Sequence, residues 1–150
     1  MRRLSSKSIL ARETEIKLVS TPRMLDLLKH DARFAGGAEE QALVSTYFDT
    51  ADHRLATAGV RLRVRANGQK LEQTMKRAHL GSATVVTQIE QNCRADREEP
   101  DLSAYPASTC KALERIAGGR AFVPLARTIV DREMRMIRHR GSRIELAFDR

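Results

Sequence analysis

The chain has 150 residues, a length that fits a single domain. Hydrophobic residues make up 41% of it and charged residues 31%, so the chain is able to bury a core and is not disordered by composition. The formal net charge of +8 favours anionic partners, such as phosphates, nucleic acid or a membrane surface. Aromatic residues make up only 4%, which argues against stacking of single-stranded bases.

The cysteines and histidines form no recognisable metal-binding pattern. Cys93 and Cys110 match no zinc spacing, and the four histidines form no HxH or HExxH pair. We therefore expect reduced thiols in a cytoplasmic protein. Residues 4–10 are interrupted by polar side chains, so we expect no signal peptide, and no later apolar run is long enough to span a membrane.

The first predicted strand contains the sequence Glu13-Thr14-Glu15-Ile16-Lys17. Alternate side chains of a strand point to the same face, so this strand places two carboxylates and one ammonium group together. Such a row of charges is costly unless water, a metal ion or a polyanion meets it.

Two helices are predicted from their ends. Thr21 and Pro22 are typical of an N-cap and a first helical residue, and Gly36-Gly37 predicts the end of that helix. Ser108 or Thr109 is expected to cap a short helix that carries Leu113 and Ile116 and ends at Gly118-Gly119.

Strands dominate the rest of the chain. Asn67-Gly68 is a strong hairpin signal, Gly81-Ser82 predicts a loose turn, and a long loop is expected from Arg94 to Pro106. The further predicted strands cover residues 43–48, 60–65, 70–76, 84–93, 126–138 and 143–148, with a short helical piece around Leu55. No repeat or linker divides them, so we expect one α+β domain, mainly antiparallel β, over residues 1–150.

Several predicted strands are charged or polar on one face and apolar on the other. The polar positions are Arg61, Arg63, Arg65, Glu72, Thr74, Lys76, Gln88, Glu90, Asn92, Glu145 and Asp149. One explanation is an antiparallel sheet with one solvated face, which is common. In the other, these faces turn inward to form a barrel with an ionic lumen. Arginine and lysine would then bind phosphate oxygens, and separate carboxylates would hold Mg²⁺ or Mn²⁺.

An ordered set of motifs resembles the CYTH domains, the triphosphate tunnel metalloenzymes. The set comprises Glu13-x-Glu15-x-Lys17, Tyr47-Phe48-Asp49-Thr50, Leu55, Gly59, Leu62-Arg63-Val64-Arg65, Gln73-Thr74-Met75-Lys76, Arg132 and Ile144-Glu145-Leu146-Ala147-Phe148-Asp149. The first motif alone is a weak signal, whereas the ordered set from Glu13 to Arg150 is specific. By residue type alone, Tyr47 and Phe48 are expected to pack in the core, and Asp49 and Thr50 are expected to organise a turn.

The resemblance implies a closed antiparallel tunnel with helices packed outside and a triphosphate in the lumen. The residues that it implies for phosphate binding are Lys17, Arg63, Arg65, Lys76 and Arg132, and those for metal binding are Glu13, Glu15, Glu90 and Glu145. Lys17 and Glu145 would also serve catalysis, by orienting or assisting the attacking water. The implied reaction is Mg²⁺- or Mn²⁺-dependent hydrolysis of inorganic triphosphate.

Alternative functions within the same fold are thiamine triphosphatase and adenylate cyclase. From another class, the alternative is a non-catalytic module that binds polyphosphate or nucleic acid. The basic residues Arg135, Arg138, His139 and Arg140, which are expected to form one solvated patch, would support that alternative. Nucleic acid is the less expected partner because aromatic residues are few.

Two features depart from the family pattern. Gln88 and Asn92 stand where the family often has arginine and glutamate, so one phosphate-binding cation and one carboxylate are missing. The chain also stops at Arg150, before the final strands that the family would supply. We therefore expect a C-terminally incomplete domain with weak activity, an open sheet edge suited to homodimerisation, and a longer parent chain that could carry a CHAD domain.

Overall fold

The computed structural model describes residues 9–78 and 85–150, with the backbone only for residues 9–14, 78 and 85–88. Its strands are β1 (Ile9–Ile16), β2 (Ala38–Thr50), β3 (Val60–Asn67), β4 (Lys70–Ala78), β5 (Val85–Ala95), β6 (Phe122–His139) and β7 (Ser142–Asp149). The helices are α1 (Pro22–His30), α2 (Arg54–Thr57) and α3 (Ala107–Ala117), with 3₁₀ turns η1 (Ala32–Phe34) and η2 (Leu102–Ala104). The mainly antiparallel sheet has the strand order β1-β5-β4-β3-β2-β6-β7.

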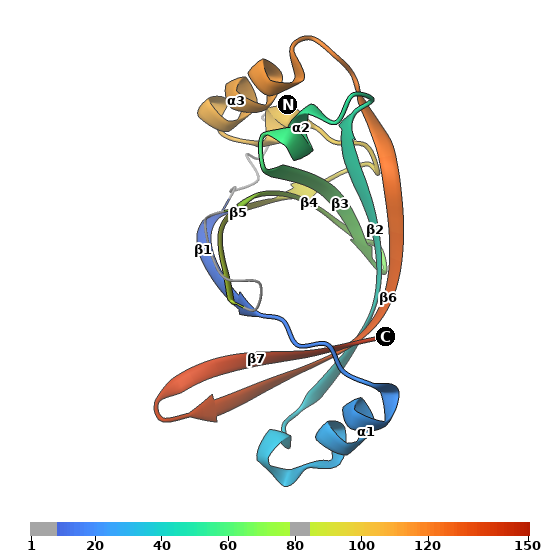
Figure 1. The fold of residues 1–150 in the computed structure, drawn as a ribbon, viewed down its shortest axis with the longest axis vertical. Coiled ribbons are helices and arrows are strands. Elements are labelled where there is room, and N and C mark those ends of the chain that lie inside the picture. Colours follow the sequence, from blue (N-terminus) through green and yellow to red (C-terminus); the bar gives the residue numbers. More distant parts are fainter. Residues whose placement is uncertain (1–8, 79–84) are drawn as a thin grey trace. The chain divides into compact units, whose positions relative to one another are not determined.

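The chain divides into two compact units. Unit 1 is Met1–Lys17 with Val44–Thr128, and unit 2 is Leu18–Leu43 with Ile129–Arg150. In unit 1, strands β1, β5, β4 and β3 lie side by side in a curved sheet (Figure 1). The mainly antiparallel α+β fold predicted from the sequence is confirmed.

The core of unit 1 lies between one face of this sheet and the elements α2, η2 and α3, which cover it (Figure 1). Leu62 and Val64 of β3 are buried there together with Leu55 of α2 and Leu113 of α3. Burying each leucine side chain contributes about 1.5–3 kcal/mol. The predicted packing of helices outside the sheet is therefore correct for unit 1.

Asp49 organises the turn between β2 and α2. One carboxylate oxygen accepts hydrogen bonds from the backbone N–H groups of Thr50 at 2.7 Å and Leu55 at 2.8 Å, and the other accepts one from Ala56 at 2.9 Å. These bonds satisfy backbone donors that a helix N-terminus leaves open, and they fix Leu55 in the core. The predicted turn-forming role of Asp49 and Thr50 is thus confirmed.

The segment expected to be one long loop, residues 94–106, contains a docked turn. Strand β5 continues to Ala95, and η2 follows. The Gln73 amide is fully buried; it donates to the backbone oxygen of Asp101 at 2.7 Å and accepts from the backbone N–H of Asp101 at 2.9 Å. This paired contact replaces a backbone ladder and holds the segment against β4.

The predicted end of one helix and the predicted start of another were wrong. Helix α1 begins at Pro22 behind its Thr21 N-cap as expected, but it ends at His30. Asp31 then adopts an extended backbone, and its carboxylate accepts from the N–H of Arg33, which favours a separate turn. Helix α3 begins at Ala107 without a side-chain cap.

In unit 2, α1 is attached to the β6–β7 hairpin mainly through charge. Arg135, expected in a solvated basic patch, is instead part-buried here, because it donates to the backbone oxygens of Lys29 at 2.6 Å and Phe34 at 3.2 Å. The Lys29 ammonium lies 2.7 Å from a carboxylate oxygen of Glu133. Lys29 and Arg135 also lie 5.7 and 5.5 Å from the centroid of the Phe148 ring, within range of cation–π attraction.

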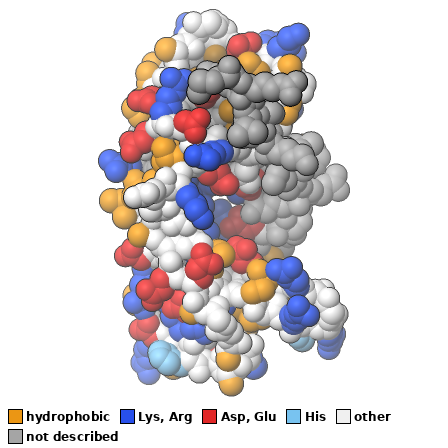
Figure 2. Space-filling view, turned by 180° about the vertical axis from the view of Figure 1, so that it is seen from behind, with side chains coloured by type: hydrophobic (Ala, Val, Ile, Leu, Met, Phe, Trp, Pro, Cys, Tyr) orange, Lys and Arg blue, Asp and Glu red, His pale blue; other side chains and the backbone are white. Residues whose placement is uncertain are grey.

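Within the described ranges, no helix is long and apolar enough to cross a membrane. Basic and acidic side chains are interspersed over the face seen in Figure 2. Of the segments interpreted from the sequence, residues 4–8 and the turn at Gly81-Ser82 lie outside the described residues.

We expect Asp49→Ala to destabilise the protein by about 2–4 kcal/mol, because it leaves buried N–H groups of the α2 turn without an acceptor. Urea unfolding followed by circular dichroism measures this loss. The matched control is Asp52→Ala, which removes an exposed carboxylate from the same turn and should cost much less. Equal losses for the two variants would contradict this role of Asp49.

We expect Glu133 to make unit 2 sensitive to acid. The hydrogen bond from Lys29, then that from Arg135, lowers the pKa of Glu133 below its ordinary value of 4.5. Its contribution to stability is therefore present above about pH 4.5 and is lost as pH falls through the lowered pKa. The melting temperature of Glu133→Gln should accordingly fall less than that of the wild type between pH 6 and pH 3, and a parallel fall would contradict the assignment.

Candidate active site

The strand register gathers the predicted polar positions on one face of the unit 1 sheet. Arg61 of β3 pairs with Lys76 of β4, which pairs in turn with Glu90 of β5. The next row places Arg63 beside Thr74. Since directly opposed residues of antiparallel strands share a face, these side chains lie opposite the helix-covered core.

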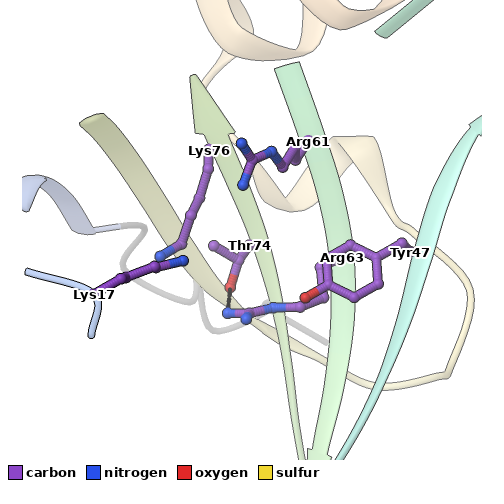
Figure 3. A pocket seen from close by; sticks show the side chains of 6 residues that line it. All are labelled: Lys17, Tyr47, Arg61, Arg63, Thr74 and Lys76. Carbon is purple, nitrogen blue, oxygen red and sulfur yellow. Dashed lines mark hydrogen bonds between the residues drawn. The ribbon is translucent and has the colours of Figure 1, made fainter. Parts of the chain in front are cut away.

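A pocket of about 70 Å³ lies on this face, with space for several water molecules. It is lined by Lys17, Tyr47, Arg61, Arg63, Thr74 and Lys76. The ammonium groups of the two lysines approach the pocket from the β1 and β4 side, and the two arginines enter it from β3 (Figure 3). Four cationic side chains, from β3, from β4 and from the residue that follows β1, therefore converge on one small space.

Arg63 is the most buried of these cations, with 9% of its surface exposed. Its Nη2 group donates to the Thr74 hydroxyl at 3.2 Å (Figure 3). Its Nε group is buried and has no hydrogen-bond partner among the described residues. A buried guanidinium with an open donor is costly, so the site is suited to an anion that accepts this hydrogen bond.

Lys76 and Glu90 form an ion pair beside the pocket. The Lys76 ammonium lies 2.7 Å from one carboxylate oxygen of Glu90, and the Asn92 amide donates to the other at 2.8 Å. The two charged side chains are 19% and 11% exposed, so water screens their attraction only partly. The pair orients both groups along the polar face of the sheet.

Glu15 and Lys17 continue the polar face at the end of β1. The ammonium of Lys17 lies 3.6 Å from a carboxylate oxygen of Glu15, and both groups are substantially exposed. In the β1–β5 register, Glu13 pairs with Gln88. The next pair on the same face is that of Ala11 and Glu90. The side chains of Glu13 and Gln88 lie outside the described residues.

The other predicted site residues are not among the lining residues of this pocket. Arg65 donates to the hydroxyl of Ser45 at 3.0 Å within unit 1. Arg132 and Glu145 belong to unit 2. There Arg132 donates to both carboxylate oxygens of Asp149, its partner in the β6–β7 register, at 2.7 and 2.8 Å. Glu145 is exposed opposite Met136.

Three lining residues, Tyr47, Arg61 and Thr74, were not among the predicted site residues. Strand parity already placed Arg61 and Thr74 on the polar face, so this signal was available for both. Tyr47 was interpreted as a core residue, but its hydroxyl group points toward the pocket beside Arg63 (Figure 3). A tyrosine in a motif rich in buried residues gives no sequence signal for this orientation.

The family model of the CYTH domain matches residues 11–150. This chain belongs to the CYTH domain family. The match covers every predicted site residue and confirms the resemblance inferred from the ordered motifs.

Two solved structures resemble this CYTH domain. One is a candidate adenylyl cyclase from Hippeastrum for which a dominant triphosphatase activity is described. It has a TM-score of 0.62 and 23% identity, with 95% of this chain and 72% of that chain covered. The other is a candidate adenylate cyclase from Bacillus halodurans, with a TM-score of 0.57 and 14% identity over 93% of this chain and 72% of that chain. At these identities the likeness shows a shared fold.

The polar face of the CYTH domain carries the donor type that a hard cation requires. Glu15 and Glu90 supply carboxylate oxygens, as Mg²⁺ and Mn²⁺ prefer. Within the described ranges, no three acidic, histidine or cysteine side chains gather closely enough to hold a metal ion by themselves.

We expect Glu90→Gln to increase the affinity of the pocket for inorganic anions when no metal is present. The change removes one negative charge beside Lys76. The interaction energy of two unit charges about 4 Å apart in water-like surroundings is about 1 kcal/mol, which corresponds to about fivefold in affinity. Calorimetric titration with tripolyphosphate in EDTA measures this effect, with Glu99→Gln, an exposed carboxylate in the segment after β5, as a control for charge. An unchanged or weaker affinity would show that the Lys76–Glu90 pair does not compete with anions.

Proposed function

We propose that this CYTH domain hydrolyses inorganic triphosphate with the help of a divalent metal ion. The observation that carries the proposal is the pocket in which Arg63, largely buried and with an open Nε donor, lies with Lys17 and Lys76. Phosphate oxygens are the acceptors that best match a guanidinium fork and neighbouring ammonium groups. Family membership and the triphosphatase activity described for the Hippeastrum protein support the same reaction.

In this proposal the chain contributes mainly positioning and positive charge. Arg63, Arg65 and Lys76 bind phosphate oxygens of the substrate, with Arg132 of unit 2 as a further phosphate ligand. Lys17 contacts the terminal phosphate or orients the attacking water, and Glu145 assists that water. Holding the phosphates in line with the water lowers the entropic part of the barrier, and the cations stabilise the charge of the transition state.

The reaction is a simple displacement at phosphorus. Water attacks the terminal phosphorus atom, the bond from that phosphorus to the bridging oxygen breaks, and phosphate and pyrophosphate are released. Glu13, Glu15 and Glu90 would hold Mg²⁺ or Mn²⁺, with Glu145 as a further ligand. The metal ion supplies positive charge that neutralises the phosphate oxygens.

Adenylate cyclase activity is the second candidate. The candidate cyclases from Hippeastrum and Bacillus halodurans, which share the fold, favour it. Thiamine triphosphatase activity and non-catalytic polyphosphate binding need the same cationic pocket. A turnover assay with triphosphate, ATP and thiamine triphosphate, with and without Mg²⁺, separates these functions by product and by metal dependence.

Two substitutions separate an enzyme from a binding module. We expect Glu15→Gln to abolish metal-dependent turnover while anion binding remains, because it removes a hard metal ligand and no phosphate contact. We expect Arg65→Ala to weaken triphosphate binding itself by about 1.5–3 kcal/mol, the usual contribution of a charge-assisted hydrogen bond. Phosphate release and calorimetric titration measure the two effects. Turnover of Glu15→Gln at the wild-type rate would refute the assigned metal role.

A further inference from the structure

Arg61 lies at the solvent side of the pocket, as Lys17 does, but it comes from the same strand as the buried Arg63. It occupies the same face of β3 as Arg63, two residues further toward the start of the strand. Arg63 is 9% exposed, whereas Arg61 is exposed although it also lines the pocket. An anion held by Arg63 in the interior therefore meets Arg61 as it extends toward solvent.

The position of Arg61 is unfavourable without such an anion. Arg61 is directly opposite Lys76 in the β3–β4 register, and like charges at directly opposed positions destabilise a sheet. The carboxylate of Glu90, which lies on the neighbouring strand β5, is 2.7 Å from the ammonium of Lys76. Among the described residues, Arg61 itself forms no salt bridge. The solvent end of the pocket thus carries a positive charge that a bound anion would neutralise.

The surroundings of Arg61 favour a charged group over a nucleoside. In Figure 3 its guanidinium lies on the Lys76 side of the pocket, whereas the ring of Tyr47 lies beside Arg63. An arginine fork binds phosphate oxygens in pairs, and its attraction grows with the charge of the phosphate. A terminal phosphate carries a charge of about −1.5 to −2 near neutral pH, whereas the α-phosphate of a nucleoside triphosphate carries a single charge and an ester oxygen.

We propose that Arg61 is a specificity-determining residue that binds the second terminal phosphate of inorganic triphosphate and so selects this substrate over nucleoside triphosphates. The inference rests on the proposed function, because it assigns an order of preference to the same pocket. In inorganic triphosphate both ends are terminal phosphates: one is hydrolysed, and the other meets Arg61. ATP places its less charged α-phosphate and its ribose at that position.

The test is the ratio of kcat/KM for tripolyphosphate to kcat/KM for ATP, measured with Mg²⁺ on the wild type and on Arg61→Gln. We expect the substitution to lower kcat/KM for tripolyphosphate about tenfold or more and that for ATP less than about threefold, so that the ratio collapses. Arg61→Lys keeps the charge but loses the guanidinium fork, so its ratio should lie between those of the wild type and Arg61→Gln. Equal losses for both substrates, or no loss for either, would overturn the proposal.

Arg77→Gln is the matched control. Arg77 follows Lys76 in β4 but is exposed on the opposite face, where it pairs with Val60, so the same charge is removed away from the pocket. The ratio should remain at the wild-type value. Circular dichroism and melting curves establish that each variant is folded.

A binding measurement separates this inference from the proposed reaction. If the wild type releases no phosphate from either compound, the proposed function fails, but calorimetric titrations with tripolyphosphate and ATP still compare the two ligands. Arg61→Gln should then lower the affinity for tripolyphosphate by about tenfold and change that for ATP little. An unchanged ratio of affinities would overturn the role of Arg61 whether or not the chain is an enzyme.

Discussion

The two-residue alternation of strand β3 is the constraint on which the rest of unit 1 depends. Val60, Leu62 and Val64 are buried against the helices, and the arginines between them lie on the opposite face. A shift of the register by one residue would exchange the two faces, placing guanidinium groups in the apolar core. Burial of the apolar face therefore determines which side chains line the pocket.

Holding these cations close together and partly buried costs free energy, and burial of the apolar face of the sheet offsets that cost. Arg63 is nearly buried with only a neutral hydroxyl, that of Thr74, as its described hydrogen-bond partner. Arg61 and Lys76 are like charges at directly facing positions, and they add repulsion across the same pair of strands. The helix-covered core, with fully buried Leu55, Leu62 and Leu113, stabilises the sheet that holds these cations in place. Fixed positive charge at such a cost is typical of a site prepared for an anion.

Unit 2 is held together by a different kind of contact. Helix α1 has nine residues and none of them is buried, so neither its length nor an apolar face makes it stable. Arg135 compensates by donating to two backbone oxygens near the end of the helix, while Lys29 pairs with Glu133. Phe148 supplies the aromatic ring under both cations. The docking of α1 therefore depends on pH and salt more than the core of unit 1 does.

The sequence by itself determined the strands, their polar faces, the β3–β4 hairpin and the family. These features depend on local periodicity, on turn residues such as Asn67-Gly68 and on the order of motifs, all of which are visible along the chain. Helix ends were less accessible, because the end of α1 depends on the backbone and carboxylate of Asp31.

Only the tertiary structure decided which residues of a polar face share a pocket. The two-residue alternation of β3 places three arginines, Arg61, Arg63 and Arg65, on the same face. Their neighbours on other strands differ. Arg65 meets Ser45 of β2, Arg63 meets Thr74 of β4, and Arg61 lies opposite Lys76. These contacts join residues that are 11 to 20 positions apart in the sequence and lie on different strands. The physical reason is that periodicity fixes the face of a side chain, whereas its exposure and partners follow from strand register and from the curvature of the sheet.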